Sequence, residues 1–253
     1  MRISYSQYNM YLTCGIKYAK KYIENIPYLS APVLVGGKAV HKGIEINYAQ
    51  KIASKVDLPV SDLKDTVADE IERGFSEELY LTGDEKTVGK EKLRGQWKDL
   101  AVSGVEVYHR DISPHVIPIG VEKEFRLQWG DHILHGYMDV VDEKRLVRDT
   151  KTSQKSPAGT VAGKSQQLTM YAIAHKALYG TLPEKLTLDY VILANGRSRT
   201  AVYETTRAEE DMRKFLMRLK RVISGIQTGV FLPPGEAWAC DYCQYSDDCT
   251  ERL

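Results

Sequence analysis

Two aspartates and a lysine stand close together in the segment GYMDVVDEKRLVRDTK, which runs from Gly136 to Lys151. Apolar and β-branched residues on each side of a polar run predict two strands joined by a turn. Asp139 lies in the first strand and Asp149 in the second, and Lys151 shares the face of Asp149 because it follows two residues later. A carboxylate in apolar surroundings is costly unless a cation or strong donors lie beside it.

A divalent metal would explain this polar cluster. Hard cations such as Mg²⁺ bind a few carboxylates, keep several waters and accept further oxygen ligands from a substrate phosphate. The ammonium of Lys151 could orient the attacking water or offset charge that develops on the phosphate. The alternative is a surface hairpin whose aspartates are solvated at its edge or support a turn, and the pattern alone leaves both interpretations open.

The composition is that of an ordinary globular protein. The 253 residues are 43% hydrophobic and 27% charged, enough for one sizeable core or two small ones. The net charge of +1 gives no global field toward nucleic acid or membranes, so a nucleic-acid enzyme would need a local basic groove. The N-terminus lacks the apolar core of a signal peptide and no window is apolar enough to span a bilayer, so we expect a cytoplasmic protein.

Two further pairs of residues lie four positions apart on predicted helices. His41 and Glu45 share a face of the helix predicted for GKAVHKGIEINYAQKI, after a loop over residues 28–35. Gln167 and Tyr171 share a face of the helix predicted after the polar loop that follows Lys151. Taken alone, the first pair is explained by a surface hydrogen bond, and the second by a buried tyrosine beside an exposed glutamine.

The loop before the second of these helices resembles a phosphate-binding loop, with Gly159, Gly163, Lys164 and Ser165. Such a loop needs four residues between its first glycine and the Gly-Lys pair, because that length lets successive amides wrap the phosphates. Only three separate them here, and no strand leads directly into the loop. Hydrolysis of ATP or GTP is therefore not expected.

The chain has four cysteines. Cys14 lies in a single N-terminal helix predicted over residues 3–26, and Cys240, Cys243 and Cys249 lie near the C-terminus. In a reducing compartment they are metal ligands or free thiols rather than disulfides. Cys14 alone would be a small buried apolar residue. Four sulfur ligands fit either tetrahedral Zn²⁺ or a 4Fe-4S cluster and would join the two ends of the chain.

The rest of the sequence predicts an alternation of helices and strands. Spaced apolar positions predict two or three helices over residues 60–112, broken near Thr82 and Gly83. Three strands should form an antiparallel meander that presents the acidic cluster. The predicted strands span residues 116–129, 133–141, 146–151, 186–193 and 201–205, and a last helix spans residues 208–228.

These motifs together resemble the PD-(D/E)XK nuclease superfamily, in the form used by RecB-like nucleases. Asp139 and, ten residues later, Asp149-Thr150-Lys151 resemble its two strand motifs. The helix motifs G-x-x-x-H-x-x-x-E and Q-x-x-x-Y are matched by Gly37, His41, Glu45, Gln167 and Tyr171.

The cysteine spacing adds to this resemblance. One cysteine near the start and three in C-x-x-C-x-x-x-x-x-C near the end resemble the iron-sulfur staple of CRISPR-associated, AddB-type and related RecB-like nucleases. This pattern favours a 4Fe-4S cluster, with Zn²⁺ as the alternative. One departure is Gly15, where family members commonly have proline after the first cysteine.

The resemblance covers essentially the whole chain and implies an α/β fold. The expected architecture is a restriction-endonuclease-like central mixed β-sheet flanked by helices, with the termini joined by the four-cysteine cluster. We expect one nuclease domain over residues 1–253. Its parts are an N-terminal helix with Cys14 (1–27), a helical part with the His41 helix (36–112), the sheet with the Gln167 and Tyr171 helix (116–206), and a C-terminal helix with the other cysteines (207–253).

The resemblance also implies a metal-dependent deoxyribonuclease. It implies an exonuclease that acts on single-stranded DNA or DNA ends in recombination, repair, phage DNA metabolism or CRISPR adaptation, with proteins of recombination or CRISPR adaptation as partners. The expected ligands of Mg²⁺ or Mn²⁺ are His41, Asp139, Asp149 and the carbonyl of Thr150, supported by Glu45; the expected catalytic residues are Asp139, Asp149, Lys151, Gln167 and Tyr171.

In this scheme Lys151 would position or help deprotonate the attacking water, and Gln167 and Tyr171 would orient these groups or the DNA strand. Two alternatives keep the same fold. One is a non-catalytic module that binds DNA ends or another protein, and the other is a nuclease stapled by zinc. The first alternative predicts loss of a ligand or of the lysine, and the sequence retains all of them.

Overall fold

The computed structural model describes residues 1–236 and 238–251, and the chain forms two compact units. The central unit consists of Ser30–Glu124 and Tyr137–Thr206. The terminal unit consists of Met1–Leu29, Phe125–Gly136 and Arg207–Leu253, so it contains both ends of the chain. Within the described residues, no helix is both long and apolar enough to cross a membrane.

The strands form a mixed sheet in the order β1-β3-β4-β5-β6, and β2 also pairs with β3. The β4–β5 pair is parallel, whereas β3–β4 and β5–β6 are antiparallel. Strands β2 and β3 each begin in one unit and end in the other. The bounds are β1 (Arg2–Ile3), β2 (Pro118–Trp129), β3 (His132–Asp142), β4 (Leu146–Ser153), β5 (Lys185–Ile192) and β6 (Arg199–Thr205).

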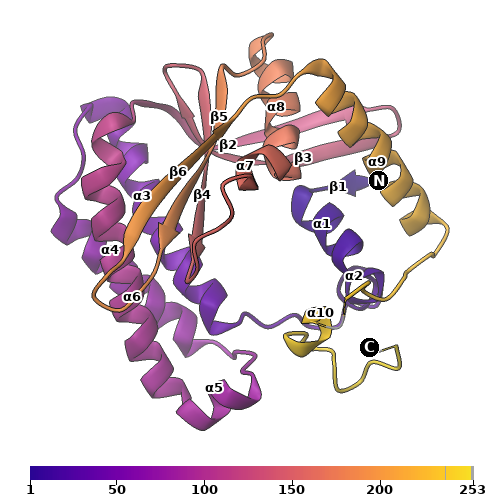
Figure 1. The fold of residues 1–253 in the computed structure, drawn as a ribbon, viewed down its shortest axis with the longest axis horizontal. Coiled ribbons are helices and arrows are strands. Elements are labelled where there is room, and N and C mark those ends of the chain that lie inside the picture. Colours follow the sequence, from indigo (N-terminus) through magenta and orange to yellow (C-terminus); the bar gives the residue numbers. More distant parts are fainter. Residues whose placement is uncertain (237, 252–253) are drawn as a thin grey trace. The chain divides into compact units, whose positions relative to one another are not determined.

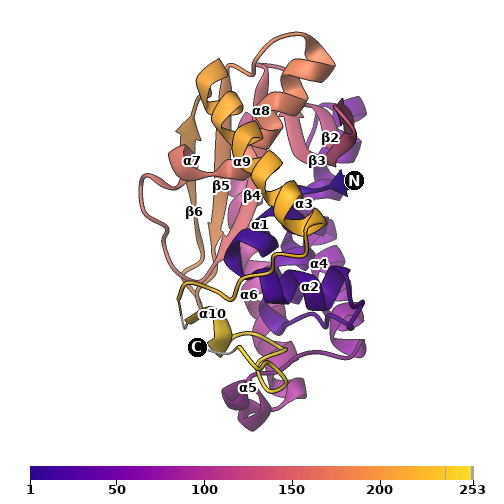
Figure 2. The ribbon, with the colours of Figure 1, turned by 90° about the vertical axis from the view of Figure 1, so that its right-hand side faces the viewer.

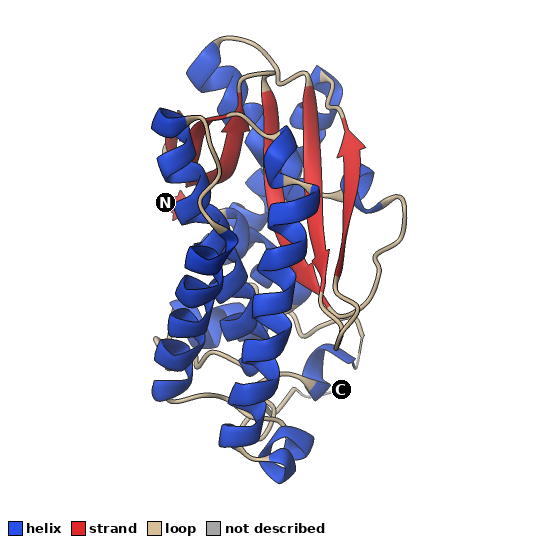
Figure 3. Cartoon of the chain, turned by 90° about the vertical axis from the view of Figure 1, so that its left-hand side faces the viewer, coloured by secondary structure: helices blue, strands red, loops and turns tan. Residues whose placement is uncertain are grey.

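Helices cover both faces of the sheet in the central unit. Figures 1 and 3 show the long helices α3, α4 and α6 on one side of β4, β5 and β6, and Figure 1 shows α7 and α8 on the other. The predicted α/β class, with a central mixed sheet flanked by helices, is therefore confirmed. The bounds are α3 (Pro32–Ser54), α4 (Val60–Ser76), α5 (Gly83–Val88), α6 (Lys90–Asp111), η1 (Ser113–His115), α7 (Val161–Lys164) and α8 (Gln166–Tyr179).

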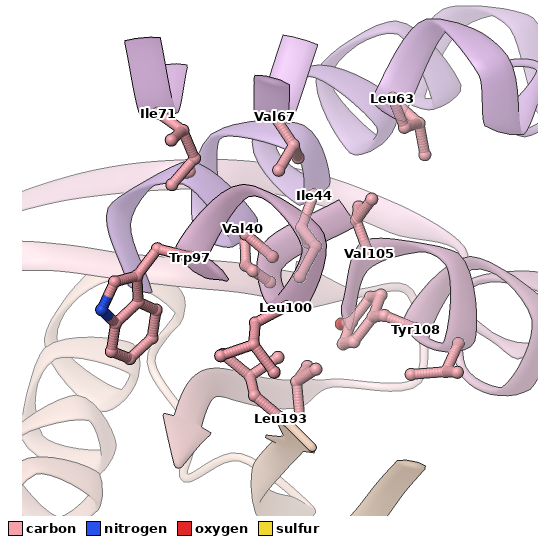
Figure 4. Close-up of a cluster of buried hydrophobic side chains, with 14 of the residues drawn as sticks. Val40, Ile44, Leu63, Val67, Ile71, Trp97, Leu100, Val105, Tyr108 and Leu193 are labelled. Carbon is pink, nitrogen blue, oxygen red and sulfur yellow. The ribbon is translucent and has the colours of Figure 1, made fainter. Parts of the chain in front are cut away.

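The core of the central unit lies between α3, α4, α6 and the sheet (Figure 4). Apolar side chains recur every four residues along α4, which places them on one buried face. Gly43 on α3 and Gly104 on α6 permit the close packing, because a Cβ at Gly104 would lie 2.4 Å from Leu193 and one at Gly43 2.9 Å from Val67. Each fully buried aliphatic side chain contributes about 1.5–3 kcal/mol.

One predicted helix boundary in this unit differs from the structure, and one agrees with it. Helix α3 begins at Pro32, within the segment predicted to be a loop, because proline suits the first turn of a helix, where its missing N–H costs nothing. Residues 60–112 form three helices, and Thr82 starts the short middle one with a capping box formed with Glu85. The predicted break near Thr82 and Gly83 agrees with this arrangement, because residues 77–82 separate α4 from α5.

The terminal unit contains α1 (Tyr5–Thr13), α2 (Gly15–Tyr22), α9 (Glu209–Gln227) and α10 (Trp238–Asp241). Figure 2 shows α1 next to α9, and the rings of Tyr8 and Phe215 lie 5.2 Å apart between these two helices. Ser4 caps α1 in a capping box with Gln7. Strand β1 pairs with β3 through Ile3 and Leu134.

The single helix predicted over residues 3–26 is wrong, because the chain breaks at Cys14. Cys14 has an extended backbone, ends α1, and caps α2 by accepting the Lys17 amide on its sulfur at 3.3 Å. The Gly15 amide donates to the Leu232 carbonyl at 2.8 Å, and a Cβ at Gly15 would lie 2.6 Å from the Leu232 nitrogen. Proline could not make this hydrogen bond, which explains the glycine at this position.

Candidate active site

Strands β3 and β4 separate next to Asp139 and Asp149, the two aspartates that the sequence predicts to be in the active site. Their register pairs Val140 with Arg148 and Val141 with Val147. Immediately beyond, the amide of Thr150 donates to Oδ2 of Asp139 at 3.0 Å. The Asp139 carboxylate thus accepts the hydrogen bond of the Thr150 amide. This contact holds Asp139 at the fork between the strands, because buried polar groups need hydrogen-bond partners.

The carboxylates of Asp139 and Asp149 converge on one hydroxyl. The Tyr171 oxygen lies 3.2 Å from Oδ1 of Asp139 and 3.3 Å from Oδ1 of Asp149. The Asp149 side chain is fully buried and that of Asp139 is 16% exposed. Burial and the neighbouring Asp139 raise the pKa of Asp149 to about 7, and burial raises the pKa of Asp139 as well.

Lys151 closes a ring of polar contacts around these carboxylates. Its Nζ lies 2.6 Å from Oδ2 of Asp149 and donates to Oε1 of Gln167 at 2.9 Å. Gln167 in turn donates from Nε2 to the hydroxyl of Tyr171 at 2.9 Å. Lys151 and Asp149 therefore form a short ion pair, in which Oδ2 of Asp149 is buried.

His41 reaches the same cluster from α3. Its Nδ1 lies 3.7 Å from Oδ2 of Asp139. Burial and the nearby Lys151 ammonium lower the pKa of the imidazole, which favours the neutral form that binds metals. Gly37, one turn earlier, faces β4 closely, because a Cβ there would lie 2.9 Å from Oγ1 of Thr152. This glycine lets the helix that carries His41 approach the strand.

Glu45 and Glu122 lie near the cluster without joining its ring of contacts. Glu45 forms an ion pair with Lys42 at 2.8 Å, and its charge still acts to raise the pKa of His41. Glu122 on β2 is not among the site residues predicted from the sequence. Desolvation raises the pKa of its carboxyl, and the charges of Asp139 and Glu45 add to this effect. Glu122 has φ +45°, a strained conformation that no spacing pattern reveals.

The donor set at the fork suits a hard cation in its chemistry. Two carboxylates and a neutral imidazole converge there, and Oδ2 of Asp149 is buried beside the Lys151 ammonium. Among the described residues, however, no group of three or more histidine, cysteine, aspartate or glutamate side chains is arranged to hold a metal ion. The Thr150 amide, the Tyr171 hydroxyl and the Lys151 ammonium stabilise the carboxylates instead, and a cation would compete with them.

The four cysteines are not joined by disulfides, and they line one cavity of the terminal unit together with Lys17, Lys20 and Tyr245. Burial raises the pKa of the Cys14 thiol, and the charges of Cys243 and Cys249 add to this effect. The chain therefore brings together residues from both of its ends. In the part of the chain that the structure describes, the four sulfurs are not arranged as a ligand set.

The near-match to a phosphate-binding loop has a structural role. Residues from Val161 to Lys164 form the four-residue helix α7, and Ser165 caps α8 by accepting the Leu168 amide at 3.3 Å. These residues therefore start the helix that carries Gln167 and Tyr171.

The pKa of Asp149 makes stability depend on pH. Because the folded protein retains a proton on this carboxyl up to about pH 7, whereas the unfolded chain releases it near 3.8, the folded state binds more protons between these values. The free energy of unfolding of the metal-free protein should therefore fall, by on the order of a few kcal/mol, as pH rises through this range. Denaturant titrations across this range should show this fall in wild type and little of it in Asp149→Asn. An equal fall in both proteins would assign the effect to other groups.

Comparison with known proteins assigns the family. The model of the PD-(D/E)XK nuclease superfamily matches residues 2–250, and the chain belongs to this superfamily. A solved structure of a candidate exonuclease from Eubacterium rectale has a TM-score of 0.52 and 11% identity, and the match covers 98% of this chain and 87% of that one. The solved structure of SSO0001 has a TM-score of 0.39 and 17% identity, and the match covers 78% of this chain and 98% of that one. No curated protein matches the chain.

Proposed function

We propose that this protein is a metal-dependent deoxyribonuclease that hydrolyses phosphodiester bonds, and that it acts as an exonuclease on single-stranded DNA or DNA ends. The convergence of Asp139, Asp149 and Lys151 at the fork between β3 and β4 carries this proposal. Membership of a nuclease superfamily supports the reaction class. The exonuclease activity is proposed from the resemblance to RecB-like nucleases. We propose that it serves recombination, repair, phage DNA metabolism or CRISPR adaptation in the cytoplasm.

In this proposal His41, Asp139, Asp149 and the Thr150 carbonyl hold Mg²⁺ or Mn²⁺. When bound, the ion supplies Lewis acidity toward the phosphate and lowers the pKa of water. The raised pKa values of the two carboxyls mean that protons leave them as the ion binds, so affinity should rise with pH up to about neutrality. The low pKa of His41 keeps its imidazole available as a ligand.

The other polar side chains act on water and on the phosphate. Lys151, which is 34% exposed, can orient the attacking water, assist its deprotonation and offset negative charge as it develops on the phosphate. Water oxygen forms a bond to phosphorus, the bond to the leaving oxygen breaks, and that oxygen takes up a proton. Gln167 and Tyr171 keep Lys151 and the carboxylates oriented through their hydrogen bonds.

Replacing Lys151 by methionine should lower kcat by about 10²–10³-fold, because the substitution removes a preorganised charge that acts in the transition state. Binding of DNA should change little, since one lysine supplies a small part of the phosphate contacts. Single-turnover cleavage and fluorescence anisotropy measure the two quantities. Lys144→Met, at an exposed position in the β3–β4 turn, is the matched control. Cleavage at the wild-type rate by the Lys151 variant would contradict the assigned role.

We further propose that the cavity lined by Cys14, Cys240, Cys243 and Cys249 holds a 4Fe-4S cluster, with Zn²⁺ as the alternative. Four thiols from the two ends of the chain beside one cavity support this proposal, because four sulfur ligands suit either group. The role would be structural, since a bound group would close a loop that contains most of the chain.

The test of the proposed activity is incubation of labelled DNA with anaerobically purified protein, with and without Mg²⁺ or Mn²⁺. Metal-dependent loss of full-length DNA supports the nuclease. Tight DNA binding without cleavage under these conditions would instead support the alternative, a non-catalytic module that binds DNA ends or a partner protein on the same fold.

A further inference from the structure

Buried polar side chains lie behind the strand that carries Asp149 and Lys151. Arg148 precedes Asp149, and it projects to the opposite face because successive side chains of a strand alternate. Its Nη1 lies 3.1 Å from Oδ2 and 3.3 Å from Oδ1 of Asp189, and its Nε lies 3.7 Å from Oδ2 of Asp142. The guanidinium therefore joins β3, β4 and β5 inside the central unit.

The contacts continue into the helical layer. The Tyr108 hydroxyl on α6 donates to Oδ2 of Asp189 at 3.5 Å, and the Tyr48 hydroxyl on α3 donates to that of Tyr108 at 3.2 Å. Tyr48 follows His41 by two helical turns and therefore lies on the same face of α3. The Arg148 network comprises Arg148, Asp142, Asp189, Tyr108, Tyr48 and Thr187, whose hydroxyl donates to Oδ1 of Asp189 at 2.9 Å.

Stability alone does not explain the Arg148 network. The Arg148 side chain is 11% exposed and those of Asp142 and Asp189 at most 1%, so one guanidinium and two carboxylates are removed from water. Arg148 Nε and Asp142 Oδ2 have no directed hydrogen bond. Replacing buried ion pairs by apolar residues of similar volume is often neutral or stabilising. What the planar guanidinium does supply is a fixed geometry between several elements.

We propose that Arg148 and Asp189 are positioning residues of the nuclease site, an inference that rests on the proposed function. They fix α3, which carries His41, relative to the strands that carry Asp139 and Asp149. The pairing of β3 with β4 ends at Val140 and Arg148, so the Arg148 network holds the sheet at the residue where the strands separate.

Loss of the Arg148 network should disturb the positions of the catalytic side chains rather than the binding of substrate. Apart from Arg148, whose side chain is 11% exposed, the network residues are buried, so the network provides little surface for DNA. A misplacement of about 1 Å at a catalytic group can cost about 10²-fold in rate. Loss of the network should therefore lower kcat and the affinity for the metal, with little change in KM for DNA.

The test compares two buried ion pairs. The double variant Arg148→Met with Asp189→Leu removes both charges and keeps most of the volume. The matched control, Lys51→Met with Asp57→Leu, removes the pair between α3 and the loop after it, in which Lys51 Nζ lies 2.8 Å from Oδ2 of Asp57. A milder variant, Tyr108→Phe, removes only the hydroxyl that links Asp189 to Tyr48. Melting temperatures establish that each variant is folded.

The readouts are kcat and KM on a single-stranded oligonucleotide, and Mn²⁺ affinity by titration calorimetry without DNA. We expect kcat of the double variant to fall by about 10- to 100-fold and its Mn²⁺ affinity to weaken by about 10-fold. The control variant should have the kcat and Mn²⁺ affinity of wild type. Both values for Tyr108→Phe should lie between those of wild type and the double variant. Wild-type kcat and Mn²⁺ affinity in the double variant, or an equal loss in the control, would overturn the proposal.

Failure of the proposed function would give a different pattern. A wild-type protein that binds Mn²⁺ at this site but never cleaves DNA would remove the nuclease function, and the Mn²⁺ affinities of the variants would still decide the positioning role. If the double variant does not fold, the Tyr108→Phe variant tests the positioning role. An unchanged kcat and Mn²⁺ affinity in this variant would then overturn the proposal.

Discussion

Replacing Asp149 by asparagine should lower metal-dependent DNA cleavage by about 10³-fold. The amide has the size of the carboxylate and can still accept a hydrogen bond from Tyr171, but it carries no negative charge to hold a divalent cation. The variant should fold normally and should be at least as stable as wild type near neutral pH, because a fully buried carboxyl beside Asp139 is removed.

Two measurements on the Asp149 variant test this expectation. Cleavage of a labelled oligonucleotide in Mg²⁺ gives the rate, and thermal melting of the metal-free protein gives the stability. Asp131→Asn, an exposed position in the β2–β3 turn, controls for loss of one negative charge. Wild-type cleavage by Asp149→Asn would remove this residue from the site, and a variant that simply unfolds would indicate a structural role.

Replacing Cys243 by serine should cause a large loss of stability. A bound cluster would link Cys14 in the N-terminal segment to three cysteines near the C-terminus, and its binding free energy would add to the stability of the folded state. We expect anaerobically purified wild type to be brown and to contain iron and sulfide. The variant should lose both and should melt at a much lower temperature.

Ser246→Ala is the matched control, because Ser246 lines the same cavity and carries no thiol. A colourless wild-type protein with bound zinc would favour the zinc staple. A variant that is as stable as wild type, from a preparation in which neither protein contains metal, would show that the cysteines hold no structural group.

Most of the residues at the fork could be predicted because their spacings are local. Asp149 and Lys151 share a strand face, and Gln167 and Tyr171 share a helix face, so the short-range periods of strand and helix place each pair. The structure brings these residues together with His41 and Asp139. Their roles in catalysis and metal binding remain proposals.

Features that depend on tertiary contacts could not be predicted. The break at Cys14 arises because Gly15 pairs with Leu232, which lies near the other end of the chain. Glu122 adopts a positive φ that alternation between polar and apolar residues does not encode. Arg148 and Asp189 pair because β4 and β5 lie side by side, a contact that no local pattern in the sequence specifies.

The most direct test of the nuclease assignment is a time course of wild-type protein with end-labelled single-stranded and duplex DNA in Mg²⁺ or Mn²⁺, with a chelator as the control. We expect metal-dependent cleavage that the chelator abolishes, and release of short labelled products from one end would identify the exonuclease polarity. Intact DNA at every time point, with metal supplied and the protein folded and bound to DNA, would contradict the assignment.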